Sequence, residues 1–367
     1  ELITTTTTEE PFILLLEFDN NSPNTTTFDP EITASSGEYK WNLGDGTIVT
    51  GTTVSHTYAD SSTKTVKLYG KGSCIITDVA LDEDNIVGEL DLSNSAFESL
   101  QNIYLYTNTA MTSVIFPETV TGTVAKIFIY STGLTGTLDL SKFTTFTATA
   151  SIFLNLNPSM TGVTFASSIT GTITYLDISL TGITGTLDLS KFTTFGTSTT
   201  IQLSGNSSMT GVTFASSITG TISTMSISVT GIIGTLDVSM FTTFTNSGSV
   251  YLRSNPSVTS ITFPSSTITG FMQSLFVYSC TSLGYLDLTK LKTSKNNISW
   301  GLYDHSWSAA IVNHILVDID GISVGAYTGR QINIDGTNAD PDSSSGGYDG
   351  SAAKTSLEGK SFTVTIT

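Results

Sequence analysis

A short pattern recurs ten times between Val79 and His305 and constrains the fold more than any other feature of the sequence. Each copy reads apolar-x-apolar-x-x-polar, as in Ile201-x-Leu203-x-x-Asn206, and successive copies lie 24 or 25 residues apart. We call the last residue of each copy the rung position. The rung positions are occupied by Asp84, Asn108, Thr132, Asn157, Thr181, Asn206, Thr230, Asn255, Cys280 and His305.

This period and pattern resemble the leucine-rich repeat, which implies a solenoid of stacked coils. The two apolar residues of each short strand are expected to point inward, because alternate strand residues face opposite sides. A buried Asn at the rung position can donate and accept at once, and it therefore satisfies backbone groups of its own coil and of a neighbouring coil. We predict that the rung residues from Asn108 to His305 form an internal structural ladder and have no catalytic role. The remainder of each coil shows no long helical period, so the fold class is mainly β, with about ten coils over residues 73–305.

The first 72 residues differ from the repeats. A Thr-rich lead, residues 1–8, is expected to be an extended arm. Residues 9–72 contain the segments Tyr39–Gly46 (YKWNLGDG), Ser55–Tyr58 (SHTY) and Thr65–Leu68 (TVKL). These segments resemble the polycystic-kidney-disease-type (PKD) domain, and the resemblance implies an immunoglobulin-like β-sandwich.

Individual residues of this N-terminal region support the same interpretation. Trp41 and Leu43 alternate inward on a strand, and Tyr58 suits a sandwich corner. His56 together with Asp45 suggests catalysis, but a structural histidine beside the Gly-Asp-Gly turn is the favoured interpretation.

Residues 306–367 are predicted to form a small α/β cap that closes the solenoid. We expect a helix over Ser306–Ile319, a short helix over Ala352–Gly359 and a final strand over Ser361–Thr367. This region resembles the C-terminal module of leucine-rich-repeat proteins encoded by bacteriophages and Bacteroidota. The resemblance rests on the segments Ser308–Leu316, Ile332–Gly336, Ala353–Gly359 and Phe362–Thr365.

Charge and hydropathy exclude two classes of partner. The chain has 14 Lys+Arg against 31 Asp+Glu, a net charge of −17, which argues against binding to nucleic-acid phosphates. No apolar run approaches the roughly 20 residues of a membrane span. The sequence begins at Glu1 without Met or a signal peptide, and we interpret it as a processed product. Cys74 and Cys280 are separated by eight coil steps, about 40 Å at roughly 4.8 Å per strand, and are not expected to pair.

Candidate catalytic groups are few, and the protein is predicted not to be an enzyme. Gly321–Gly325 spells G-x-S-x-G, but a nucleophile elbow lies between a strand and a following helix, whereas this segment follows a helix. The three histidines show no zinc-ligand spacing. No cofactor is expected, apart from a weak calcium candidate in one polar loop whose alternative is an ordinary solvated loop. Its carboxylates are Asp335, Asp340, Asp342 and Asp349.

A binding surface is predicted on the outward side of the repeat strands, where aromatic residues gather toward both ends of the array. Exposed aromatic patches and solenoid faces often bind partners. The alternative is that aromatic residues merely suit strands, or are covered by another domain or subunit. The predicted face comprises Tyr104, Tyr106, Phe128, Tyr130, Phe153, Tyr251, Arg253, Phe276 and Tyr278, and Gly301 and Tyr303 continue it.

From these features we expect a non-enzymatic structural or adhesive protein on a bacteriophage virion surface, such as a fibre, spike or decoration component. The alternative is a secreted or cell-surface adhesin of a Bacteroidota bacterium, and an enzyme acting on polysaccharide is the least supported reading. Expected partners are other virion or surface proteins and a host receptor or glycan. A homo-oligomer is possible.

Overall fold

The computed structural model describes residues 10–293, 296–323 and 327–366, so the predicted arm over residues 1–8 lies outside the described residues. The protein is mainly β, with 43% strand and 9% helix. It has an N-terminal β domain, called the PKD domain below after the resemblance noted above, and a β-solenoid of about nine turns, where the sequence predicted about ten. By their contacts the residues divide into Glu1–Thr147 with Thr164–Ala166, and Ala148–Val163 with Ser167–Thr367.

The described part of the first unit, from residue 10 on, contains nine strands and one short 3₁₀ helix, η1 (Ser95–Phe97). The strands are β1 (Ile13–Asn20), β2 (Glu31–Asn42), β3 (Ile48–Thr50), β4 (Lys64–Ala80), β5 (Ile86–Asp91), β6 (Asn102–Tyr104), β7 (Ala110–Ile115), β8 (Val124–Phe128) and β9 (Gly136–Leu140).

The second unit holds the later coils, two α-helices and a further 3₁₀ helix. Its strands are β10 (Phe146–Phe153), β11 (Met160–Phe165), β12 (Ile173–Asp177), β13 (Gly185–Leu189), β14 (Phe195–Gln202), β15 (Met209–Phe214), β16 (Ile222–Ser226), β17 (Gly234–Asp237), β18 (Phe244–Tyr251), β19 (Val258–Thr262), β20 (Met272–Phe276), β21 (Ser299–Gly301), β22 (Arg330–Asn333) and β23 (Phe362–Thr365). Its helices are α1 (Ala309–Ile322), η2 (Ser345–Gly347) and α2 (Gly350–Gly359).

In the N-terminal region β4 lies between β1 and β2 and pairs antiparallel with both, while β3 pairs with β2. These strands thus share one hydrogen-bonded sheet, and residues 52–56 bond back to residues 28–32. Trp41 and Leu43 are fully buried, as their alternation predicted, and Tyr58 is almost fully buried. Their burial makes them the centre of this core.

Strand β4 belongs to both the PKD domain and the solenoid. Its first half pairs with β1 and β2, and its last residues, from Asp78 to Ala80, pair in parallel with β6. The predicted boundary between residues 72 and 73 therefore falls inside one continuous strand. The PKD strands also cover the first solenoid strands: β2 runs antiparallel along the end of β4, and the end of β1 pairs with β5.

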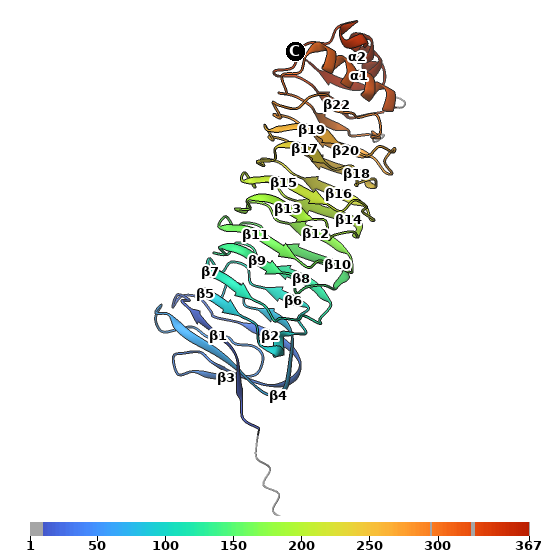
Figure 1. Ribbon diagram of the computed structural model, residues 1–367. Coiled ribbons are helices and arrows are strands. Elements are labelled where there is room, and N and C mark those ends of the chain that lie inside the picture. The colour runs from blue at the N-terminus through green and yellow to red at the C-terminus, as the bar shows by residue number, and fades with distance from the viewer. Residues whose placement is uncertain (1–9, 294–295, 324–326, 367) are drawn as a thin grey trace, which may run out of the picture. The chain divides into compact units, whose positions relative to one another are not determined.

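In the second unit each coil contributes a strand to a long parallel sheet. The parallel pairs run in the order β10–β12–β14–β16–β18–β20–β21 (Figure 1). Shorter two-stranded sheets, β13–β15 and β17–β19, form on other sides of the coils. Along the long sheet the inward residues are buried; Leu176 and Ile201, for example, are opposite each other in the register and inaccessible to solvent.

The residue before each rung adopts a left-handed backbone conformation. Leu156, Leu180 and Val229 have φ of 59°, 55° and 56°, and the equivalent Gly205 has φ of 79°. Such conformations cost non-glycine residues roughly 1–2 kcal/mol, yet the same turn recurs because it redirects the chain at the end of every strand. The cost is met by the buried residues on either side of the turn.

The parallel sheet continues beyond His305, where the sequence repeat was predicted to stop. Strand β21 pairs with β22, and β22 pairs with β23, both in parallel. Helix α1 is inserted between β21 and β22 and ends three residues beyond the predicted Ile319. The described helices include none that is long and apolar enough to cross a membrane.

Candidate functional site

The rung residues are buried, and the Asn rungs bond to the backbone. The Asn206 amide nitrogen donates to the carbonyl oxygens of Leu203 and Ile178, at 2.9 and 2.8 Å. Its oxygen accepts from the backbone N–H and the hydroxyl of Thr181, at 2.8 and 2.7 Å. One amide therefore satisfies backbone groups of its own coil and of the coil before it.

Other Asn residues repeat this geometry. Asn255 bonds to Thr230 and to two carbonyls in the same way, and Asn108 does so with Ile86, Leu81 and Leu105. Thr132 and Asn157 are likewise buried. Asn338 forms a further rung that was not predicted from the sequence. Its side-chain oxygen accepts from the N–H groups of His305 and Trp307. It lies 33 residues after His305, because α1 lengthens this coil.

Cys280 and His305 occupy rung positions without reactive character. Burial raises the pKa of the Cys280 thiol to about 11, so it stays protonated and unreactive near neutral pH. Both cysteines are free thiols. Burial lowers the pKa of His305, and contacts of its ring nitrogens with the carbonyls of Cys280 and Val277 oppose that change. The ring stacks on Trp307 at 4.1 Å, which makes His305 a packed structural residue.

In the first unit, outward aromatic residues of β6 and β8 and of the residues just after them form stacked pairs. Tyr106 lies parallel to Tyr130 with ring centroids 4.8 Å apart, and Tyr104 meets Phe128 edge to face at 5.5 Å. The Lys126 ammonium lies 5.4 Å from the Tyr104 ring centroid. All four rings are half-buried, because each covers part of its neighbour.

The second unit carries a larger aromatic group toward its C-terminal end. Tyr251 stacks on Phe276 with centroids 5.5 Å apart, and Tyr278 stacks on Tyr303 at 4.4 Å. The Arg253 guanidinium donates to the Tyr278 hydroxyl at 2.9 Å. The predicted residues are thus brought together, and Tyr303 joins them.

A separate pair lies earlier in this unit. Phe153 stacks on Tyr175 with ring centroids 4.5 Å apart. Tyr175 was not among the predicted outward residues, although it precedes the inward Leu176 by one residue and strict alternation along β12 places it on the outward face.

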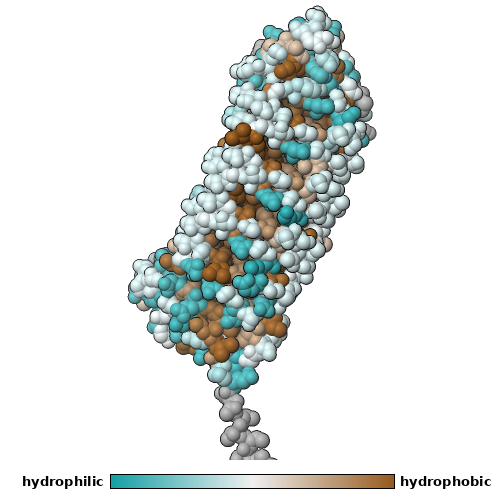
Figure 2. Space-filling model, in the orientation of Figure 1, coloured by the Kyte–Doolittle hydropathy of each residue, from teal (hydrophilic) through white to brown (hydrophobic). Residues whose placement is uncertain are grey.

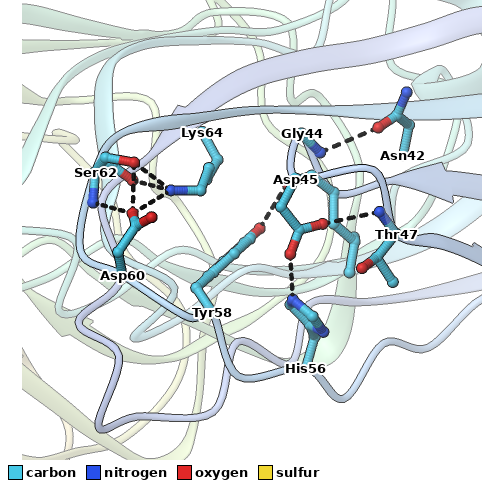
Figure 3. A network of polar contacts seen from close by, with 10 residues as sticks. Asn42, Gly44, Asp45, Thr47, His56, Tyr58, Asp60, Ser62 and Lys64 are labelled. Carbon is cyan, nitrogen blue, oxygen red and sulfur yellow. Dashed lines mark hydrogen bonds and ion pairs between the residues drawn. The ribbon is translucent and has the colours of Figure 1, made fainter.

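The PKD domain holds a polar network around the Gly-Asp-Gly turn (Figure 3). His56 Nε2 lies 2.7 Å from the Asp45 carboxylate, and the same carboxylate accepts from the Thr47 N–H at 2.9 Å. Burial alone would raise the pKa of Asp45, but these hydrogen bonds outweigh it and lower the pKa. The Tyr58 hydroxyl donates to the Leu43 carbonyl at 3.0 Å. These contacts tie the turn to the strand ends, which agrees with the structural interpretation of His56.

The four carboxylates of the calcium candidate do not form a common site. Asp342 accepts from the backbone N–H groups of Ser344 and Ser345 and from Asn313. Asp349 caps α2 by accepting from the Ala352 N–H at 2.8 Å. Asp335 accepts from the Gly336 N–H, and the loop also contains Asp340. Across residues 10–293, 296–323 and 327–366, no three His, Cys, Asp or Glu side chains are grouped to hold a metal ion.

Charged residues make up only 12% of the chain. Figure 2 shows large areas of near-neutral hydropathy on the face turned toward the viewer, as the abundance of Ser, Thr and Gly in the repeats leads one to expect. On such a surface the stacked aromatic groups are the most distinctive features.

Comparison with known proteins identifies the N-terminal region. The family model for the PKD domain matches residues 15–74, close to the 9–72 predicted from the sequence. The curated proteins and the solved structures gave no match.

Proposed function

We propose that this protein is a non-enzymatic attachment protein on the surface of a bacteriophage particle, and that a leucine-rich-repeat-type solenoid presents its aromatic strand face to a host receptor or glycan. The observation that carries the proposal is the stacking of Tyr and Phe rings on the outward side of the repeat strands. Rings held by their neighbours lose little conformational entropy on binding, which favours a binding surface.

The assignment to the leucine-rich repeat is supported by the apolar-x-apolar-x-x-Asn pattern and by the Asn rungs. The proposed display on a virion draws on the resemblance of residues 306–367 to modules of phage proteins. PKD domains often mediate protein contacts, so the N-terminal domain is proposed to join the protein to other surface components. The alternative proposal is that a protein built from the same modules is displayed on the surface of a Bacteroidota cell.

Mass spectrometry of purified phage particles tests the display. Detection of the protein at a stoichiometry comparable with known structural proteins supports the proposal. Recovery only from bacterial surface fractions would overturn it in favour of the cell-surface alternative.

Binding by the aromatic face is tested with the double variant Tyr104→Ala, Tyr278→Ala. We expect attachment of the purified protein to host cells to fall about tenfold or more, since each 1.4 kcal/mol of lost contact energy is a factor of ten. The melting temperature should change little, because both rings are half-exposed. The matched control replaces two exposed apolar residues elsewhere, Ile115→Ala with Ile233→Ala. Equal attachment by the two double variants and the wild-type chain contradicts the proposed role.

A further inference from the structure

An open cleft of about 370 Å³ lies at the C-terminal end of the aromatic face, within the second unit. Sites for small molecules typically have volumes of ~300–1,000 Å³. Strands β20 to β23 supply most of its walls. The lining residues used below are Phe276, Gly301, Tyr303, Gln331 and Asn333.

Gly301 lines the cleft between the two aromatic residues and has no side chain. In the register of the parallel sheet Phe276 pairs with Gly301, and Gly301 pairs with Asn333. A Cβ atom on Gly301 would lie 2.9 Å from Phe276 Cδ1 and 3.1 Å from Tyr303 Cε1. The two rings therefore approach the space over the glycine backbone, where any other residue would place atoms.

Both aromatic walls are held in place by further rings. Phe276 lies nearly parallel to Tyr251, at an interplanar angle of 4°, and Tyr303 lies nearly parallel to Tyr278, at 10°. Arg253 in turn bonds to the Tyr278 hydroxyl. The rings bordering the cleft are thus pre-organised, which lowers the entropic cost of binding a ligand against them.

The polar part of the lining carries amides and hydroxyls and no charge. Gln331 is exposed, and Asn333 uses its oxygen to accept from the Asp335 N–H at 3.0 Å, which leaves its amide N–H groups directed elsewhere. Ser299, Thr363 and Thr365 add hydroxyls. Side-chain amides offer donors and acceptors together, as sugar hydroxyl groups do. The lining offers no counter-charge to an anionic or cationic ligand.

We propose that this cleft binds a neutral carbohydrate, with a sugar ring in contact with both Phe276 and Tyr303 and its hydroxyl groups bonded to Gln331 and Asn333. This inference deepens the proposed function and rests on it, because it names the ligand class for one part of the aromatic face. Aromatic rings provide flat apolar contact for the C–H groups of a sugar. Neutral amides select hydroxyl-bearing ligands over apolar ones, since a ligand lacking those hydroxyls leaves polar groups unpaired.

The test measures binding of the full chain to an array of neutral, sialylated and sulfated glycans, using three variants. Gly301→Val fills the cleft and suits a strand. Gln331→Ala removes an exposed amide without touching the core. Gly284→Ala is the control, because its new Cβ would meet nothing closer than 3.8 Å. We expect the wild-type and control chains to bind one neutral glycan group, and each cleft variant to bind it about tenfold or more weakly.

The inference is overturned by no retention of neutral glycans by the wild-type chain, by retention of charged glycans only, or by equal binding of neutral glycans by all variants. The Gln331→Ala chain keeps the test decisive if Gly301→Val fails to fold. Host-cell attachment is measured in parallel. If the wild-type chain attaches to host cells but binds no glycan, only the carbohydrate cleft is rejected. If the wild-type chain neither binds glycans nor attaches to host cells, the proposed function is rejected as well. A receptor destroyed by protease but not by glycosidase would point to a protein partner and overturn the carbohydrate assignment.

Discussion

Residue identity at the rung position decides how many buried backbone groups find a partner. An Asn amide donates to two carbonyls and accepts from the neighbouring coil, as Asn206 does. Asp84 occupies the first rung with a carboxylate instead. Its Oδ1 accepts from the Asp29 N–H at 3.2 Å, but its buried Oδ2 has no hydrogen-bond partner among the described residues.

Replacing this carboxylate with an amide should stabilise the protein near neutral pH. Burial raises the pKa of Asp84 well above its usual value. The hydrogen bond from the Asp29 N–H opposes this rise, and the negative charges of Asp29 and Asp82 add to it. A raised folded-state pKa gives stability that is present below the unfolded value of about 3.9 and is lost as pH rises through the folded value. We therefore expect Asp84→Asn to raise the free energy of unfolding at pH 7 by about 1–3 kcal/mol, with a smaller gain at pH 4. Urea unfolding of the wild-type and variant chains at pH 7 and at pH 4 measures the change in the free energy of unfolding.

The converse substitution provides the control. Asn206→Asp places a carboxylate oxygen against the carbonyls of Ile178 and Leu203 and should destabilise the protein at pH 7. If Asp84→Asn is neutral or destabilising at pH 7, the buried carboxylate does not destabilise the folded protein, and the prediction is wrong.

At the scale of elements, helix α1 and the polar loop before α2 depend on one buried amide. Asn313 on α1 donates to Asp342, to the Ser345 carbonyl and to the Tyr348 carbonyl, at 2.9–3.1 Å. Its oxygen accepts from the Asp342 N–H at 3.0 Å. Gly350 must be a glycine here, because a Cβ at that position would lie 2.1 Å from the Asn313 oxygen.

Asn313→Ala should loosen this loop. Removing the amide leaves partly buried backbone groups of the loop unpaired, at a cost of about 2–6 kcal/mol if two of them cannot reach water, at roughly 1–3 kcal/mol each. We expect a lower melting temperature and faster proteolysis between Asp340 and Asp349. Asn296→Ala, which changes an Asn outside the loop, is the control variant. If Asn313→Ala does not change the rate of cleavage within the loop, the proposed role of Asn313 is wrong.

At the scale of the molecule, the first unit shows how the solenoid avoids exposed strand edges. Unpaired edges are templates for association with other chains. Here the end of β4, residues 78–80, pairs antiparallel with β2, and the first two residues of β5, Ile86 and Val87, pair antiparallel with the end of β1. The PKD domain is therefore a structural part of the solenoid.

Removal of residues 1–72 should make the chain self-associate, because β1 and β2 would be lost while the strand edges that they cover remain. Size-exclusion chromatography with light scattering should show oligomers or aggregates in place of the species formed by the full chain. Adding Ala80→Lys to the shortened chain places a charge on the exposed edge and should reduce association. A stable monomer after truncation would show that the edges need no cover.

Much of the fold could be predicted from the sequence because the repeat is local and periodic. A period of 24–25 residues places each apolar pair inward and each Asn at a rung, so the buried ladder and the outward position of Tyr106 and Tyr278 follow from spacing alone. The PKD domain was predicted from its WNLGDG and SHTY segments, which carry the core Trp41, the turn and Tyr58.

The sequence by itself thus determined the solenoid, its ladder and the choice of outward residues, since each depends on residues near one another in the chain. Only the tertiary structure decided which edges are covered, that Asn338 adds a rung after the inserted α1, and that Gly301 lines a cleft with Phe276 and Tyr303. These features depend on register between segments 25 to 64 residues apart, as for Phe276 with Gly301 and for Asn20 with Asp84. Local patterns do not encode such register; the packing of neighbouring coils sets it.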